Sequence, residues 1–166
     1  MNATAHPKTA LRPYLPADVP FLADIFRASI EELTGDDYTQ EQQQAWAATA
    51  DDLTEFAERL AARLTLVATL EGSPIGFAAL EGADKIHMLY VHPAVTGQGV
   101  GAMLIDALER LAAARGAAKL IVQASDTASG FFQHRGFIPQ TRNSVLRGDE
   151  WLANTTMEKK LKEPSR

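Results

Sequence analysis

The fold of this chain is decided by one stretch of its sequence, Leu89-Tyr90-Val91-His92-Pro93-Ala94-Val95-Thr96-Gly97-Gln98-Gly99-Val100-Gly101. A short apolar strand runs into a proline turn, three glycines follow at every second position, and a helix rich in alanine and leucine begins at about Ala102. Glycines leave backbone N–H groups uncovered, and the N-terminus of a helix attracts anions. The stretch therefore predicts a site where main-chain amides hold a phosphate or pyrophosphate.

Two other kinds of glycine-rich loop fit this stretch less well. A P-loop requires a Gly-Lys pair, which the sequence lacks. A Rossmann turn follows its strand directly and is followed by an acidic residue at the end of the next strand. Here residues 92–96 separate the strand from the glycines, and the next strand, Lys119–Ser125, has no acidic residue. A turn that only starts a helix would need one glycine, and further glycines cost backbone entropy.

A second motif follows downstream, Ala128-Ser129-Gly130-Phe131-Phe132-Gln133-His134-Arg135-Gly136-Phe137. Together with Thr96–Gly101 it makes the segment from Ile86 to Phe137 resemble the core of the GNAT superfamily, the Gcn5-related N-acetyltransferases, in a small, single-domain form of bacterial type. The signature of that family is [Arg/Gln]-x-x-Gly-x-[Gly/Ala], a helix, a strand, and a short helix ending in Phe-Tyr-x-x-x-Gly-Phe. Two positions depart from it. Thr96 stands where the family has Arg or Gln, and Phe132 stands where many members have a tyrosine that protonates the leaving thiolate.

Apolar periodicity and turn signals give an order of elements that is neither plain βαβ alternation nor all-β. Strands are predicted at Ala10–Leu15, Leu64–Leu70, Ile75–Leu80, Ile86–Val91, Lys119–Ala124, Thr141–Leu146 and Trp151–Leu161. Helices are predicted from Asp18 to about Leu33, from Thr39 through Trp46, after a cap at Asp51-Asp52, from about Ala102 to Gly116, and from Asp126 or Thr127 to Arg135.

The resemblance implies an α/β (mixed α+β) GNAT fold. Such a fold has a central, twisted, mostly antiparallel sheet of six to seven strands with helices on both faces. The sheet splays open at the acyl-CoA site, between the strands Ile86–Val91 and Lys119–Ala124. Residues 10–162 are expected to form a single N-acetyltransferase domain, with 1–9 as a flexible N-terminal arm and 163–166 as a frayed tail.

Composition restricts the possible partners. The chain has 166 residues and a net charge of −5, which disfavours nucleic acid and anionic membranes as partners. It contains no cysteine, so a thiol nucleophile, a disulfide framework and cysteine-based zinc sites are excluded. The four histidines lack metal-ligand spacing, so no metal site is predicted. No apolar stretch approaches the length of a membrane span, and a cytoplasmic location is expected.

The cofactor implied by the resemblance is acetyl-CoA. Its pantetheine arm would pair with the backbone of the loop-bearing strand, the glycine loop would hold its pyrophosphate, and the following strand and short helix would form the other wall. The cofactor-binding residues carried over in this way are Leu89, Tyr90, Val91, Gly97, Gln98, Gly99, Val100, Gly101, Ala102, Ser125, Ala128, Phe131 and Phe132.

Three residues are candidates for catalytic proton transfer: His87, Tyr90 and Ser125. A histidine titrates near neutral pH, which suits a base, although an exposed or locally bonded His87 is equally ordinary. Tyr90 is a candidate proton donor to the thiolate, with packing in the core as the alternative reading. On a regular strand Tyr90 faces away from His87, unless a bulge intervenes. Ser125 is a candidate for proton donation, cofactor binding or helix capping.

The acceptor pocket is predicted from Tyr38, Trp46, Glu31 and Trp151. In the family, the first two helices and the final hairpin build this pocket. The aromatic rings are expected to stack on an amine and the acids to attract its cationic form. The alternative is that both Tyr38 and Trp46 only pack the helices together.

The function implied is that of an acyl-CoA-dependent N-acyltransferase. It would transfer acetyl from acetyl-CoA to a primary amine of a small molecule or a peptide N-terminus, by direct attack in a ternary complex. The alternative, motivated by Phe132, is a non-catalytic module that binds or senses acyl-CoA; a nucleotide-dependent oxidoreductase is more distant. The resemblance also leaves a homodimer open.

Overall fold

The computed structural model describes residues 8–162. Residues 1–7 of the predicted arm and the predicted tail, 163–166, lie outside the described residues. Thr9, the last residue assigned to the arm, already belongs to the first strand. Within residues 8–162, no helix combines the length and the apolar character that a bilayer crossing requires.

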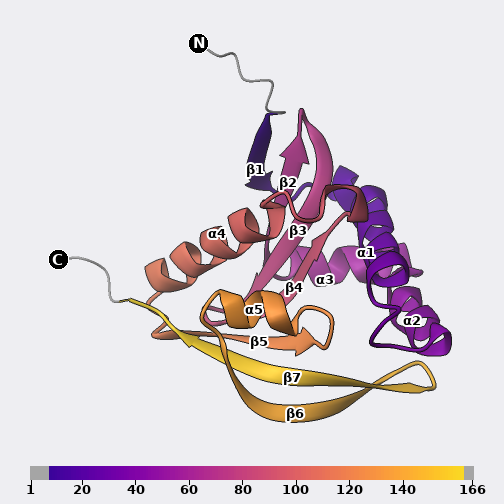
Figure 1. The fold of residues 1–166 in the computed structure, drawn as a ribbon. Coiled ribbons are helices and arrows are strands. Elements are labelled where there is room, and N and C mark those ends of the chain that lie inside the picture. Colours follow the sequence, from indigo (N-terminus) through magenta and orange to yellow (C-terminus); the bar gives the residue numbers. More distant parts are fainter. Residues whose placement is uncertain (1–7, 163–166) are drawn as a thin grey trace.

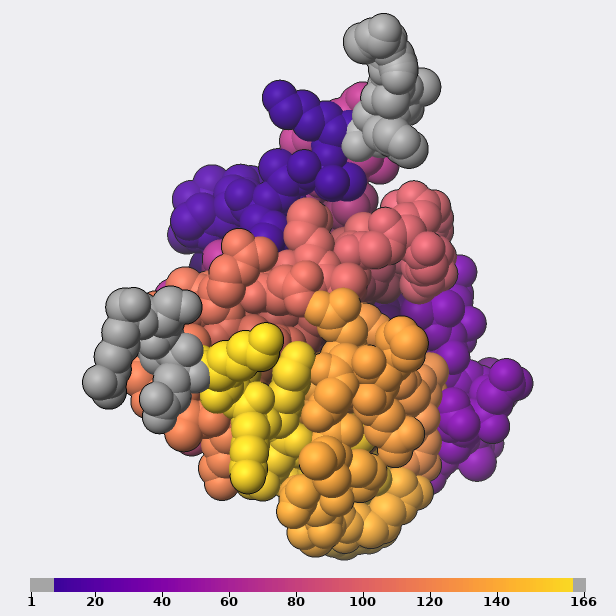
Figure 2. Space-filling model, turned by 60° about the vertical axis from the view of Figure 1, so that its left-hand side comes forward, coloured from indigo at the N-terminus to yellow at the C-terminus, as the bar shows by residue number. Residues whose placement is uncertain are grey.

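One twisted sheet runs through the protein (Figure 1). Its strands are β1 (Thr9–Pro13), β2 (Leu64–Leu70), β3 (Ser73–Glu81), β4 (Lys85–Val91), β5 (Lys119–Ser125), β6 (Ile138–Arg147) and β7 (Glu150–Lys160). They lie in the order β1-β2-β3-β4-β5-β7-β6, so that the β6–β7 hairpin (orange and yellow in Figure 2) lies at the opposite end of the molecule from β1 (indigo). Only the pair β4–β5 is parallel, and the other neighbours are antiparallel. The predicted mostly antiparallel sheet is confirmed.

Helices cover both faces of the sheet (Figure 1). They are α1 (Val19–Leu33), α2 (Gln40–Ala47), α3 (Leu53–Ala61), α4 (Val100–Ala114) and α5 (Ser129–His134), with the 3-10 turns η1 (Pro16–Asp18), η2 (Ala48–Ala50) and η3 (Pro93–Val95). On one face α1 and α3 bury Phe26 and Phe56 against Phe77 of β3. On the other face α4 buries Leu104 and Leu108 against β3, β4 and β5. These two apolar layers hold the sheet in place.

Helix caps follow the predicted signals in the region before β2. Thr39 accepts a hydrogen bond from the Gln42 amide (3.1 Å), and the Gln42 side chain accepts one from the Thr39 amide (2.8 Å). Asp52 caps α3 by accepting bonds from the amides of Thr54 and Glu55, both at 3.1 Å. Such caps satisfy amides that a helix leaves unpaired. They stabilise the first turns of α2 and α3, both of which contact α1.

A β-bulge interrupts β4. In the ladder with β3, Ala79 pairs with Met88 and Leu80 with Ile86, so His87 is an extra residue. After the bulge the alternation of side chains is shifted. Leu89 packs in the same apolar layer as Ile86, whereas Met88 packs in the layer of α1 and α3.

The sheet splays open just after the bulge begins. The strands β4 and β5 pair only at Lys85–Ile121 and Ile86–Val122. Beyond these pairs β5 continues with β7 as far as the pair Ser125–Asn154, while β4 continues with β3. The predicted splay between the two strands is confirmed.

Candidate active site

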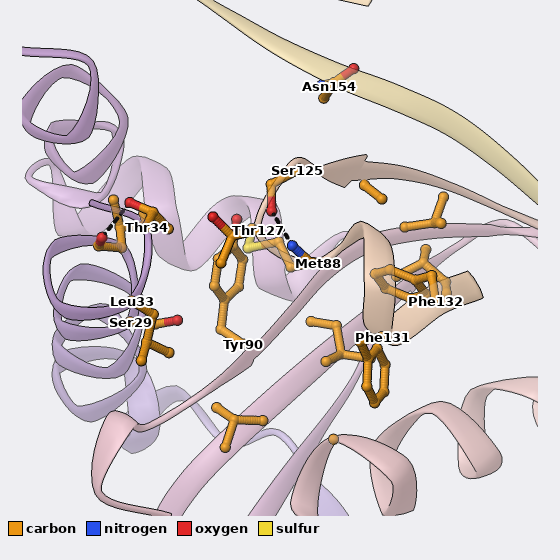
Figure 3. A pocket seen from close by; sticks show the side chains of 18 of the residues that line it. Ser29, Leu33, Thr34, Met88, Tyr90, Ser125, Thr127, Phe131, Phe132 and Asn154 are labelled. Atoms are coloured by element: carbon orange, nitrogen blue, oxygen red, sulfur yellow. Dashed lines mark hydrogen bonds between the residues drawn. The ribbon is translucent and has the colours of Figure 1, made fainter. Parts of the chain in front are cut away.

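A pocket of about 1000 Å³ occupies the opening between β4 and β5 and reaches α1 and the β6–β7 hairpin. Figure 3 shows it between α1 on one side and α4 and α5 on the other. It includes the three predicted catalytic residues and almost all of the predicted cofactor residues. Those that line it are His87, Leu89, Tyr90, Val91, Gly97, Gly99, Val100, Gly101, Ala102, Ser125, Ala128, Phe131 and Phe132.

The glycine loop presents free amides to this pocket. Helix α4 begins at Val100, two residues before the predicted start, and its N-cap Gly99 has a left-handed backbone (φ +85°). The first α4 turn closes with the bond from the Met103 amide to the Gly99 carbonyl (3.0 Å). Among residues 8–162, no acceptor meets the amides from Gly99 to Ala102. They are therefore available to an anion.

Gln98 differs from its neighbours in the loop. Its amide donates to the Val95 carbonyl (3.3 Å), and Gln98 does not line the pocket. The hydroxyl of Thr96, at the family's Arg or Gln position, donates to the Pro93 carbonyl (2.9 Å) and stabilises the turn. We therefore leave Gln98 out of the cofactor site.

Gly101 allows helices α4 and α5 to approach each other. A Cβ atom at Gly101 would lie 3.3 Å from Cε1 of Phe131. Phe132, next to it, is 4% exposed, with its ring centroid 5.2 Å from the rings of both Phe131 and Phe137. The residue at the family's tyrosine position is thus an apolar wall of the pocket, with no proton to donate.

The segment between β5 and α5 is organised differently from the prediction. Helix α5 begins at Ser129 with no side-chain cap, so the predicted cap at Asp126 or Thr127 is wrong. Ser125 accepts a bond from the Ala128 amide (3.0 Å) instead (Figure 3). Asp126 pairs with Arg142, and Thr127 donates to Asp37, because long-range partners compete for both side chains.

His87, the extra residue of the bulge, lines the pocket as a neutral imidazole. Its Nδ1 lies 3.6 Å from Oε1 of Glu81, which also accepts a bond from Arg63 (2.9 Å). Burial and the charge of Arg63 lower the pKa of His87 to about 4. Its Nε2 atom is buried and has no partner among the described residues. A neutral imidazole with one free nitrogen can accept a hydrogen bond from a water or an amine.

Tyr90 projects from β4 into the space between α1 and Ser125 (Figure 3). Its ring is stacked on Phe77 at 5.8 Å and meets Phe26 edge-on at 4.7 Å. Burial raises the pKa of Tyr90 to about 12, with the Trp46 indole acting in the opposite direction. Its hydroxyl therefore keeps its proton at neutral pH.

The acceptor end is the part of the pocket between α1 and the β6–β7 hairpin, and Tyr38 connects its walls. Its ring lines the pocket 5.4 Å from the ring of Trp46, and its hydroxyl donates to the Ala153 carbonyl at 2.6 Å. Glu31 is exposed on α1 outside the pocket, and Trp151 is 61% exposed at the start of β7. The structure does not bring these two residues to the predicted acceptor site, because the helix and the strand turn them outward. We leave them out of that site.

The sequence interpretation did not assign several polar residues that line the acceptor end, among them Ser29, Thr34, Asn154 and Arg147. Ser29 follows Ile25 and Phe26 at helical spacing, so the periodicity of α1 could have placed it on the inner face. Arg147 carries no such signal, because it lies in the turn between the predicted strands Thr141–Leu146 and Trp151–Leu161.

The family model described as an acetyltransferase (GNAT) domain matches residues 34–161. The chain belongs to the GNAT acetyltransferase family. An uncharacterized N-acetyltransferase of Escherichia coli, YafP, is 31% identical to this GNAT chain over 150 residues, covering 90% of this chain and 95% of the relative. The peptidyl-lysine N-acetyltransferase YjaB of Salmonella typhimurium is 28% identical over 125 residues, covering 75% of this chain and 70% of the relative.

Solved structures show the same GNAT fold. A GCN5-related N-acetyltransferase from Rhodopseudomonas palustris is 58% identical with a TM-score of 0.91, covering 97% of this chain and 99% of that one. The PaiA N-acetyltransferase of Thermoplasma acidophilum, solved with coenzyme A, is 19% identical with a TM-score of 0.77 and coverages of 92% and 99%. The resemblance, the fold class and the activity of an acetyl-CoA-dependent N-acetyltransferase are confirmed.

Proposed function

We propose that this N-acetyltransferase acetylates a primary amine of a small molecule or a peptide N-terminus, by direct attack within a ternary complex. The observation that carries the proposal is the continuity of the pocket. The same cavity includes the free amides of the glycine loop and the compartment between α1 and the β6–β7 hairpin. Two substrates held in one cavity can react with each other directly, which lowers the entropic part of the barrier.

The donor end suits acetyl-CoA in two respects. The amides from Gly99 to Ala102 would bind its pyrophosphate, where a helix N-terminus favours negative charge. The backbone of β4 at Leu89 and Val91 has no ladder partner on the side of β5 and would pair with the amides of the pantetheine arm. Phe131 and Phe132 would cover the opposite side.

The reaction moves an acetyl group from sulfur to nitrogen. A bond from nitrogen to the carbonyl carbon forms, the carbon–sulfur bond breaks, the nitrogen loses a proton and the thiolate gains one. Tyr90 is the proposed proton donor, because its hydroxyl is protonated and lines the pocket. His87 is the proposed acceptor of the amine proton, through water, at its unpaired Nε2. Ser125 is the proposed second donor beside the thiolate.

The amine acceptor is supported by one relative in particular. YjaB is named for lysine residues in peptides, and the lysine side chain is also a primary amine. The cytoplasmic location and the homodimer stay predictions.

The test is an assay of the purified protein with acetyl-CoA and a panel of primary amines. Release of the CoA thiol is followed, and products are identified by mass spectrometry. We expect acetylation of at least one amine class and none with the enzyme omitted. Binding of acetyl-CoA without turnover across the panel would favour the alternative of a non-catalytic acyl-CoA-binding module.

A further inference from the structure

The acceptor end of the pocket has an unusual balance of charge. Glu81 is the one carboxylate among the described residues that line the pocket, and it lies opposite Lys85 at the start of β4. There it is bound to Arg63. The acceptor compartment lies at the other end of β4, around Tyr90, and no described lining residue there bears a negative charge.

Arg147 supplies positive charge to that compartment. It stands at the end of β6, and the hairpin that carries it packs on α2, where Gln42 donates to the Trp151 carbonyl (2.8 Å). Figure 1 shows this hairpin turn beside α2. Arg147 and Tyr90 line the same pocket, and the charge of Arg147 opposes the rise in the pKa of Tyr90 that burial causes.

Most N–H donors of the Arg147 guanidinium have no partner among the described residues. Its one described hydrogen bond goes from Nη1 to the neighbouring Leu146 carbonyl (3.0 Å). Asp149 and Glu150 belong to the same hairpin, yet no described carboxylate oxygen lies within 4.0 Å of the guanidinium nitrogens of Arg147. By contrast, Arg142, on the same strand, is paired with Asp126 (2.9 Å). A partly buried arginine with free donors is suited to bind a carboxylate at two points.

The opposite wall adds a free hydroxyl. Ser29 on α1 is 9% exposed and lines the pocket, and its hydroxyl makes no hydrogen bond to another described residue. In Figure 3 this hydroxyl points from α1 toward the side of Tyr90. The compartment thus offers hydrogen-bond donors and a cation, with an aromatic wall from Trp46, and no anion for an ammonium group.

We infer that the acceptor of this enzyme carries a carboxylate close to its primary amine, as an amino acid does, and that Arg147 binds that carboxylate. The inference rests on the proposed function and narrows its substrate class. Arg147 is a specificity residue in it: the arginine fixes the acceptor in the pocket and disfavours di- and polycationic amines, for which the compartment has no counter-charge.

The test compares amino acids with their primary amides, which share a side chain and an amine and differ in the carboxylate. We expect the wild-type enzyme to have a higher kcat/KM for the acids. We expect Arg147→Gln to lower the ratio of acid to amide by about tenfold to a hundredfold, the range for loss of a charge-assisted hydrogen bond. Arg147→Lys should keep part of the preference, and Arg147→Glu should reverse it. The acid and the amide differ in amine pKa, and comparing the ratio between the wild type and a variant, at one pH, cancels that difference.

Arg142→Gln is the matched control, because Arg142 lies on the same strand outside the pocket. It should leave the acid-to-amide ratio unchanged. An equal ratio in the wild type and Arg147→Gln, or a wild-type preference for diamines, overturns the inference. Melting temperature and acetyl-CoA affinity of each Arg147 variant confirm folding, and three different replacements guard against one that fails to fold.

A second measurement separates this inference from the proposed function. Calorimetry of the complex with CoA, titrated with amino acids and their amides, reports acceptor binding without turnover. If acids bind to the wild type and not to Arg147→Gln while nothing is acetylated, the charge selection stands and the proposed activity fails. If amines are acetylated without regard to their carboxylate, the activity stands and the charge selection fails.

Discussion

The hydroxyl of Tyr38 accepts a hydrogen bond of 2.9 Å from the backbone amide of Asp126, a residue 88 positions further along the chain. The same hydroxyl donates to the Ala153 carbonyl in β7. One side chain therefore joins the segment before α2, the end of β5 and the final hairpin. These are three walls of the acceptor compartment.

Replacing Tyr38 with phenylalanine should destabilise the protein by about 1–3 kcal/mol, since two backbone groups lose their partner in a buried place. Urea unfolding measures the change. We also expect a higher KM for the acceptor and little change for acetyl-CoA. Tyr14→Phe is the control, because the Tyr14 hydroxyl makes no hydrogen bond to another described side chain or carbonyl. Equal stability of Tyr38→Phe and the wild type would contradict the bracing role.

Gly99→Leu should weaken binding of acetyl-CoA by about tenfold or more, because a side chain at the helix N-cap covers amides that would hold the pyrophosphate. Gly72→Leu is a matched control. Gly72 has nearly the same backbone (φ +89° against +85°), has open space around a Cβ as Gly99 does, and lies in the turn between β2 and β3. Both variants suffer similar backbone strain, and only the first should lose affinity in calorimetry. Equal affinities would remove the phosphate assignment.

Tyr90→Phe tests proton donation. If Tyr90 protonates the thiolate, kcat should fall by about a hundredfold, with the KM for acetyl-CoA little changed. Because the pKa of Tyr90 is about 12, the wild-type rate should show no loss from Tyr90 ionisation at pH 8–10. Steady-state kinetics across pH measures both effects. If Tyr90→Phe keeps the wild-type kcat, Tyr90 is not the proton donor and only packs against Phe77 and Phe26.

His87 should make the protein sensitive to mild acid. Its folded-state pKa of about 4 lies below the ordinary value of 6.5, so the unfolded chain binds the proton more readily between these values. The free energy of unfolding therefore falls as the pH drops from 6.5 to 4, by about 3 kcal/mol at most from this group.

His87→Gln should remove that part of the acid sensitivity, measured by urea unfolding at pH 7 and pH 4.5. His134→Gln, at the exposed end of α5, serves as the comparison. The same loss of stability in His87→Gln and the wild type would mean that the imidazole is not the responsible group.

Local signals in the sequence were enough for much of the fold. The strand Leu64–Leu70 and the caps Thr39 and Asp52 are found where they were predicted, because a turn, an apolar run or a cap depends on neighbouring residues. Helix α4 starts earlier than predicted, since Gly99 supplies the left-handed residue from which the helix departs.

The remaining features depend on partners distant in the chain. The bulge at His87 arises from pairing with β3, which spacing along β4 does not reveal. Asp126 reads as a cap in sequence and is bound by Arg142 in space. Arg147 reads as a turn residue and reaches a pocket whose other walls are α1 and α2. The donor site was predictable because a loop motif contains it, whereas the acceptor site is assembled from separate segments.

The short pairing of β4 with β5 has a thermodynamic consequence. Two strands that part after Ile86 and Val122 leave main-chain groups without a partner in the ladder, and a bound molecule can pair with them. Occupancy and conformational stability are then coupled, and the melting temperature should climb with the logarithm of the thioester concentration once the site is saturated. In a cell depleted of the acyl donor, more of this enzyme would be unliganded and would therefore unfold more easily.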